Sequence, residues 1–91
     1  MQQLTIELPQ ELSIMTIEAH SAALLAQLAQ SEGDIAFDAA ALQWVDTAGV
    51  QLLCVIVGEA QAQHRAISWQ SSSEALNTTA QLLGLTQTLS I

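Results

Sequence analysis

The sequence predicts an α/β domain, residues 1–91, in which one mixed β-sheet of about four to five strands packs against three to four helices. Segments with apolar residues at every second position alternate with segments whose apolar residues recur at helical spacing. A chain of 91 residues can bury one core and leaves no room for a second domain. Because 51% of the residues are apolar and only 11% are charged, against the usual quarter or so, we expect a folded chain.

The first part of the chain predicts two strands, a helix and a third strand. Alternation over residues 4–8 indicates a strand with one buried face. After Pro9 and Gln10, residues 11–14 are expected to form a short strand that reverses direction and can pair antiparallel with the first. A helical pattern covers residues 16–30, and residues 34–38 have the pattern of a short central strand. The apolar face of this helix consists of Ile17, Leu24, Leu25 and Leu28.

A second and more apolar helix is expected in the middle of the chain. Residues 50–57 form a nearly unbroken apolar segment, and residues 58–63 continue it with good helix formers. Asp46 or Thr47 can cap its first turn. The segment is shorter than the roughly 20 apolar residues that cross a bilayer, so a buried helix of about four turns is predicted.

The C-terminal part predicts another strand and a third helix. Alternation over residues 66–70 indicates the strand, which follows a turn at residues 64–65. Residues 71–74 offer N-cap and capping-box side chains for the helix, and Gly84 suits the left-handed position at its end. Residues 87–91 form either a final strand or a short terminal helix, and the pattern leaves both open.

Charge and cysteine content exclude several classes of function. Nine acidic residues face a single Arg65 and no lysine, which gives a formal charge of −8, so nucleic acid and anionic lipid surfaces are not expected partners. A lone Cys54 cannot form an intramolecular disulfide and is expected to be buried as a small hydrophobe. The N-terminus lacks the features of a signal peptide, so we expect a cytoplasmic protein without direct membrane insertion.

No catalytic or metal-binding constellation is recognisable. His20 and His64 lie in different elements, and neither has a zinc-like spacing to Cys54. Three aspartates at positions 34, 38 and 46 form no acid/base pair, although Asp38 ends a strand on the side where ligands often bind in α/β sheets. The glycines make no phosphate-binding loop. We therefore expect no enzyme, no cofactor and no metal.

Trp44 and Trp69 are the two large aromatic candidates for the core or for an interface. Trp69 alternates with Ile67 on one side of its strand and is predicted to lie in the core. Trp44 is either an exposed interface anchor or a core residue beneath the following loop, and core packing is the preferred interpretation. The low charged fraction favours contact with another protein.

Residues 45–49, Val-Asp-Thr-Ala-Gly, place a hydroxyl at the start of the apolar helix. The free amides of a first helical turn and the helix dipole favour an anion, so a phosphoryl group on Thr47 would be tolerated electrostatically. The alternative is that Asp46 and Thr47 only cap a core helix, and spacing alone favours that alternative.

In its full setting this motif resembles the signature of the STAS domain family, the anti-sigma factor antagonists and their relatives. Residues 45–50 are similar to the family's Asp-Ser-Ser-Gly-Leu or Asp-Thr-Gly-Gly-Leu motif. Residues 8–13 are similar to its Gly-Glu-Leu-Asp block between the first two strands. Residues 75–76 and 82–85 look like its last helix and the turn that follows. The resemblance covers almost the whole chain and implies a STAS fold.

The resemblance implies a partner switch. In the family the hydroxyl residue directly after the aspartate is the phosphoacceptor, which is Thr47 here. Unphosphorylated, such a domain binds an anti-sigma factor or a related GHKL-type serine/threonine kinase, and phosphorylation releases it. The expected contact surface consists of Ser13, Ile14, Met15, Asp46, Thr47, Ala48, Gly49 and Val50.

Three departures from the family pattern keep other functions open. Gln10 and Ser13 stand where the family block has glycine and aspartate, and Ala48 replaces the second hydroxyl of the commonest signature. A STAS subunit of a phospholipid-transport ABC complex, which binds the ATPase subunit without phosphorylation, is one alternative. A chemotaxis-associated module and a small-ligand binder are others, although the lack of basic residues disfavours an anionic ligand.

Overall fold

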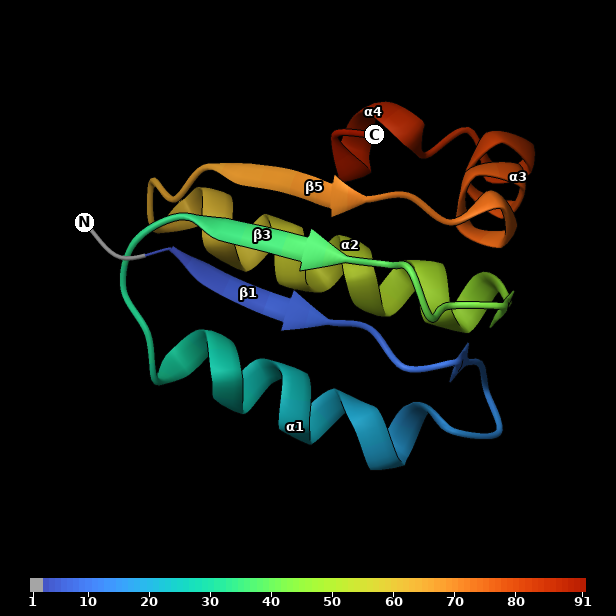
Figure 1. The fold of residues 1–91 in the computed structure, drawn as a ribbon, viewed down its shortest axis with the longest axis horizontal. Helices are drawn as coiled ribbons and strands as arrows, with labels where there is room; N and C mark the ends of the chain where they lie inside the picture. Colours follow the sequence, from blue (N-terminus) through green and yellow to red (C-terminus); the bar gives the residue numbers. More distant parts are fainter. Residues whose placement is uncertain (1–2) are drawn as a thin grey trace.

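The computed structural model describes residues 3–91 (Figure 1). Its elements follow the predicted order, with one further strand of two residues, Trp44–Val45, which the sequence pattern did not indicate. The strands are β1 (Leu4–Glu7), β2 (Glu11–Leu12), β3 (Ile35–Asp38), β4 (Trp44–Val45) and β5 (Ile67–Ser71). The helices are α1 (Ile17–Ala29), α2 (Thr47–Ala62), α3 (Glu74–Leu83) and α4 (Thr86–Leu89). The α/β class is confirmed, and the end of the chain is the short helix α4.

The strands form two parallel sheets, a three-stranded sheet of order β1-β3-β5 and a two-stranded sheet of β2 and β4. The expected antiparallel pairing of β1 with β2 is wrong, because β1 pairs with β3 and β2 pairs with β4. The chain does not reverse at Pro9 and Gln10. The Leu8 amide still donates to the Asp38 carbonyl (2.9 Å), and the Gln10 carbonyl then accepts from the Trp44 amide (3.1 Å). The segment from β1 to β2 therefore runs beside the segment from β3 to β4.

One face of the three-stranded sheet packs into the core, and the other face has exposed side chains on its two outer strands around the buried Ala36. Ile6, Phe37 and Trp69 lie side by side on the buried face, where the Phe37 and Trp69 rings stack with centroids 4.7 Å apart. Thr5 and Ser68 flank Ala36 on the opposite face and are exposed. In Figure 1, no helix of residues 3–91 lies in front of the three strands. Alternating sequence in β1 and β5 thus encodes a sheet with one solvent-facing side.

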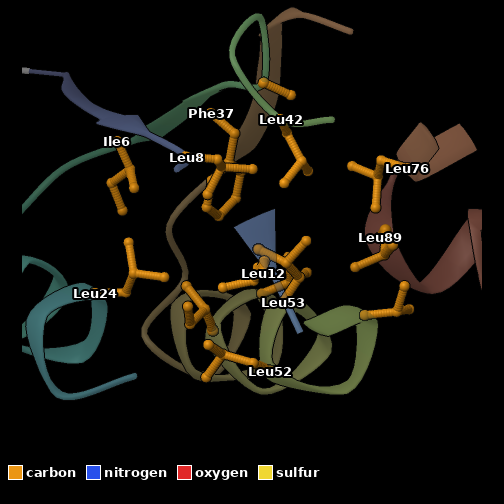
Figure 2. Packing of buried hydrophobic residues seen from close by; sticks show 14 of the residues in the cluster. Ile6, Leu8, Leu12, Leu24, Phe37, Leu42, Leu52, Leu53, Leu76 and Leu89 are labelled. Carbon is orange, nitrogen blue, oxygen red and sulfur yellow. The ribbon is translucent and has the colours of Figure 1, made fainter. Parts of the chain in front are cut away.

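The core lies between the buried sheet face and the helices, as Figure 2 shows. Its fully buried large side chains are Phe37, Ile6, Leu12, Ile35, Leu53, Ile56, Leu76, Leu89, Val50 and Val57. Trp69 packs against this core, as predicted, and its indole Nε1–H donates to the Leu89 carbonyl at 2.9 Å. That bond attaches α4 to the sheet.

Several side chains are more exposed than the sequence pattern indicated, among them Val55 of the apolar segment and Leu82 of the third helix, which are 53% and 82% exposed. Trp44 is 59% exposed, so the core interpretation is wrong: in the two-residue strand β4 the inward position is taken by Val45. Cys54 is only partly buried, and burial raises the pKa of its thiol. Leu25 lies at the margin of the buried face of α1. Among residues 3–91, no helix has the length and apolar character needed to cross a membrane.

Candidate functional site

Parallel pairing of β2 with β4 brings the two sequence motifs together. The strands pair through Glu11 with Trp44 and through Leu12 with Val45. Because both strands point the same way, their C-terminal ends meet, and the chain leaves β2 into residues 13–16 and β4 into residue 46. The Ser13 loop and the start of α2 are therefore neighbours, as the prediction of one joint surface requires.

Thr47 is the first residue of α2 and is exposed. Asp46 before it has an extended backbone (φ −110°, ψ −172°), and its side chain accepts a hydrogen bond from the Gly49 amide. Asp46 is therefore the N-cap, one of the two candidates named from the sequence. The Thr47 hydroxyl lies where the amides of the first turn and the helix dipole favour negative charge.

Asp46 also fixes the neighbouring loop. One carboxylate oxygen, Oδ1, accepts from the Gly49 amide at 3.0 Å, and Oδ2 accepts from the Ile14 amide at 2.9 Å. These two bonds, the Ile14 bond first, hold the pKa of Asp46 below its usual range because they stabilise the ionised form. The carboxylate thus links α2 to the loop between β2 and α1.

Gly49 allows α2 to lie directly against β2. A Cβ atom at this position would stand 2.0 Å from the Leu12 carbonyl oxygen and 2.8 Å from Val45 Cγ2. Contact this close leaves no room for any side chain. The glycine of the motif is therefore required by the packing of the helix start against β2.

The loop after β2 is held by its own hydrogen bonds. The Ser13 hydroxyl donates to Glu11 Oε2 at 2.6 Å and accepts from the Met15 amide at 3.2 Å. Thr16 Oγ1 accepts from the Ser13 amide at 3.1 Å. These bonds leave Ile14 and Met15 at the tip, 67% and 86% exposed. Two apolar side chains therefore project into solvent beside the start of α2.

The eight residues predicted to contact a partner fall into three groups by exposure. Ile14, Met15 and Thr47 are exposed, Ser13, Asp46 and Ala48 are partly buried, and Gly49 and Val50 are buried. The last two lie beneath the surface in this structure, where Val50 belongs to the core. The accessible part of the predicted surface thus consists of Ile14, Met15 and Thr47, with Ser13, Asp46 and Ala48 accessible in part.

Trp44 and Glu11 border this surface and were not assigned to it from the sequence. Together with Ser13, Val45 and Asp46 they line a hollow of about 350 Å³. The register of two-residue strands decides their position, and no periodicity can be read over so short a length. The only sequence signal was a tryptophan two residues before Asp46.

The electrostatics around Thr47 are negative. Glu11 and Asp46 lie close by, whereas Arg65, the only Lys or Arg of the chain, follows the far end of α2. The 16 residues of α2 span about 24 Å. Arg65 is buried and donates to the Leu28 carbonyl (3.0 Å), to the Ser31 hydroxyl (2.7 Å) and to the Gly33 carbonyl. A phosphate on Thr47 would therefore have helix amides but no arginine or lysine of this chain as partners.

Among residues 3–91, the other titratable groups do not assemble a second site. Asp38 accepts hydrogen bonds from the Ser71 hydroxyl and the Ala40 amide, which together lower its pKa. Within residues 3–91, no three His, Cys, Asp or Glu side chains are grouped so that they could hold a metal ion. The surface around Thr47 is thus the candidate site.

Comparison with known protein families identifies the family of the domain. A family model described as "Mlab, STAS domain" matches residues 1–90. A search of curated proteins gave no match to the sequence. The match includes the segments on which the sequence resemblance rested, namely residues 8–13, 45–50, 75–76 and 82–85.

Proposed function

The chain belongs to the STAS domain family, and we propose that it is a non-catalytic bacterial protein-binding module of the anti-sigma factor antagonist type. It acts in the cytoplasm by partner switching, with Thr47 as the phosphorylated residue. The partner is an anti-sigma factor or a GHKL-type serine/threonine kinase. STAS domains are in general regulatory modules that interact with protein partners. For this chain we add partner switching and Thr47 as the residue that controls it.

The observation that carries this proposal is the exposed Thr47 hydroxyl at the start of α2, beside two projecting apolar side chains. Ile14 and Met15 can be buried by a partner, and Asp46 holds their loop against the helix that carries Thr47. A phosphate adds a charge of about −1.5 to −2 at this point. Because Asp46 and Glu11 are already negative there, burying the phosphate in an interface would be costly, so phosphorylation releases the partner.

An affinity pull-down from the native host tests the switch. Wild type, Thr47→Ala and Thr47→Glu are used as bait, and mass spectrometry reads both the captured proteins and phosphothreonine at position 47. We expect wild type and Thr47→Ala to retain the same partner and Thr47→Glu to lose it. Thr88→Glu, at an exposed threonine of α4, is the matched control for the added charge. Equal capture by all four proteins would disprove the switch.

A second candidate is a STAS subunit of a phospholipid-transport ABC complex that binds its ATPase constitutively. It is favoured by the lack of a cation near Thr47 and by Ala48, which leaves no second hydroxyl beside it. This function predicts stable co-purification with an ATPase and no phosphothreonine in the same pull-down. A chemotaxis-associated module would use the same surface with another signalling partner, which the identity of the captured protein would reveal.

A further inference from the structure

Trp44 is the largest of the exposed apolar side chains among residues 3–91. It is 59% exposed, although it lies in strand β4 next to Val45, which packs against the core. Burying a tryptophan is one of the larger apolar gains available to a protein, and tryptophan is enriched among the residues that carry binding energy at interfaces. An indole left in solvent next to the candidate site therefore points to an anchor for a partner.

Trp44 stands between two hollows. On one side lies the hollow of about 350 Å³ that it shares with Glu11, Ser13 and Asp46. On the other side lies a hollow of about 520 Å³ between β4 and α3, whose lining includes Glu74. Trp44 and Val45 line both. The indole thus lies between two hollows that each have a carboxylate in their lining. No lysine or arginine is among the lining residues of either hollow.

The geometry next to Glu11 is the more specific of the two. Glu11 and Trp44 are register partners on neighbouring parallel strands, which lie about 4.8 Å apart. The Ser13 hydroxyl donates to one carboxylate oxygen of Glu11 and so restrains that side chain. An aromatic ring and a restrained carboxylate at this spacing match a guanidinium group, which stacks on indole and pairs with carboxylate oxygens.

We propose that Trp44 and Glu11 form a docking point for an arginine side chain on the surface of the protein partner. The net charge of −8 disfavours a second copy of this chain, a nucleic acid or an anionic membrane as the occupant. The same charge attracts a basic protein surface and speeds its approach. The inference rests on the proposed function because it assigns a chemistry to the partner that meets the Thr47 surface.

NMR titration of the ¹⁵N-labelled protein tests the docking point without the natural partner. The probe is N-acetyl-Gly-Arg-Gly-amide, compared with peptides in which lysine or neutral citrulline replaces the arginine. We expect saturable shifts of the Trp44 indole N–H and of the Glu11 and Ser13 amides. Trp69, whose indole N–H is bonded to the Leu89 carbonyl, should not move and serves as the internal reference. Binding should be tightest for arginine and weakest for citrulline.

Two substitutions make the test specific to this point. Trp44→Leu should weaken binding of the arginine peptide about two- to fivefold, the range of an exposed cation–π contact. Glu11→Gln should weaken it by roughly one and a half- to fivefold, the range of an exposed ion pair. Glu59→Gln, at an exposed acid about 18 Å further along α2, should change it less than either. The spectrum of each variant shows directly that it is folded.

Shifts spread evenly over the acidic residues, or equal effects of Trp44→Leu and Glu59→Gln, would overturn the docking point. Such a result would leave the Thr47 switch intact, because the peptide titration does not involve Thr47. Conversely, a partner that is captured equally by wild type and Thr47→Glu would overturn the switch, even if the arginine peptide binds at Trp44. The two experiments therefore fail independently.

Discussion

Asp46 accepts hydrogen bonds from two segments that are far apart in the sequence. Its contacts with the Gly49 and Ile14 amides at once cap α2 and position the loop that carries Ile14 and Met15. Replacing a capping aspartate by alanine costs roughly 0.5–2 kcal/mol. We predict a loss near the upper end of that range for Asp46→Ala at neutral pH, because a second amide also loses its acceptor. Urea unfolding of the variant and wild type measures it.

The pH dependence of this loss follows from the lowered pKa of Asp46. An unfolded aspartate titrates near pH 3.9, and the folded carboxyl titrates below that value. Its stabilising effect is therefore complete above about pH 5 and is lost as the pH falls through the folded pKa. The stability difference between wild type and Asp46→Ala should shrink below about pH 4. A difference that is constant from pH 7 to pH 3 would contradict the assigned role of the carboxylate.

Arg65 is the second residue whose side chain bonds to segments far away in the sequence. Its guanidinium donates to the end of α1 at Leu28, to Ser31 and to Gly33, all while buried. Arg65→Ala should lower the free energy of unfolding by roughly 2–4 kcal/mol, because buried acceptors lose their donors. Arg65→Lys keeps the charge but not the planar set of donors, so it should recover only part of the loss. Denaturant unfolding of both variants checks this, and wild-type stability in Arg65→Ala would contradict it.

At the scale of elements, the two glycines of α2 differ in how closely other atoms approach them. Gly49 lies against the Leu12 carbonyl and Val45, whereas an added Cβ at Gly58 would meet no atom within 4 Å. Alanine is favoured over glycine in a helix by about 1 kcal/mol. We predict that Gly58→Ala stabilises the protein by roughly 0.5–1 kcal/mol. Gly49→Ala should destabilise it by about 1–3 kcal/mol, because overpacking exceeds the gain in helix propensity.

Thermal or urea unfolding of the two glycine variants forms a matched comparison, since both change the same residue type in the same helix. If Gly49→Ala were as stable as Gly58→Ala, the close approach of α2 to β2 would not exist in solution. A structural shift of the Ser13 loop in a folded Gly49→Ala variant would support the geometry further, because the clash acts on the Leu12 carbonyl directly before that loop.

The types of the longer elements were predictable from the sequence, but the strand β4 and the strand pairing were not. The helices and the alternating strands β1 and β5 have patterns long enough to show a period. β2 and β4 have two residues each, so neither their partner nor their direction leaves a periodic signal. Because these strands are so short, the exposure of Trp44 and its pairing with Glu11 could not be predicted. Thr47 and Asp46 were found because a cap followed by a long apolar helix is a local pattern, whereas Glu11 joins the site only through tertiary pairing.

At the scale of the whole molecule, the net negative charge affects thermal stability. The only lysine or arginine is buried among carbonyl, hydroxyl and amide acceptors, so most of the charge of −8 acts as mutual repulsion. Salt shortens the range of this repulsion from about 30 Å at 0.01 M to about 3 Å at 1 M. We predict that added sodium chloride raises the melting temperature, with the largest change at low ionic strength.

Calorimetry in a sodium chloride series measures that effect at fixed pH. An electrically neutral osmolyte at matched osmolality is the control, because it leaves the repulsion between carboxylates unscreened. A melting temperature that falls with salt would mean that favourable ion pairs outweigh repulsion, which is incompatible with the surroundings of Arg65.

The surface that joins Thr47 to the Ile14 and Met15 loop is the central element of the proposed function. Its most direct test is the affinity of the captured partner for the purified protein, measured by calorimetry with Thr47 unmodified and with Thr47 phosphorylated. The proposal predicts binding to the unmodified form and a loss of at least tenfold in affinity on phosphorylation, which corresponds to about 1.4 kcal/mol. Equal affinity of the two forms would contradict it.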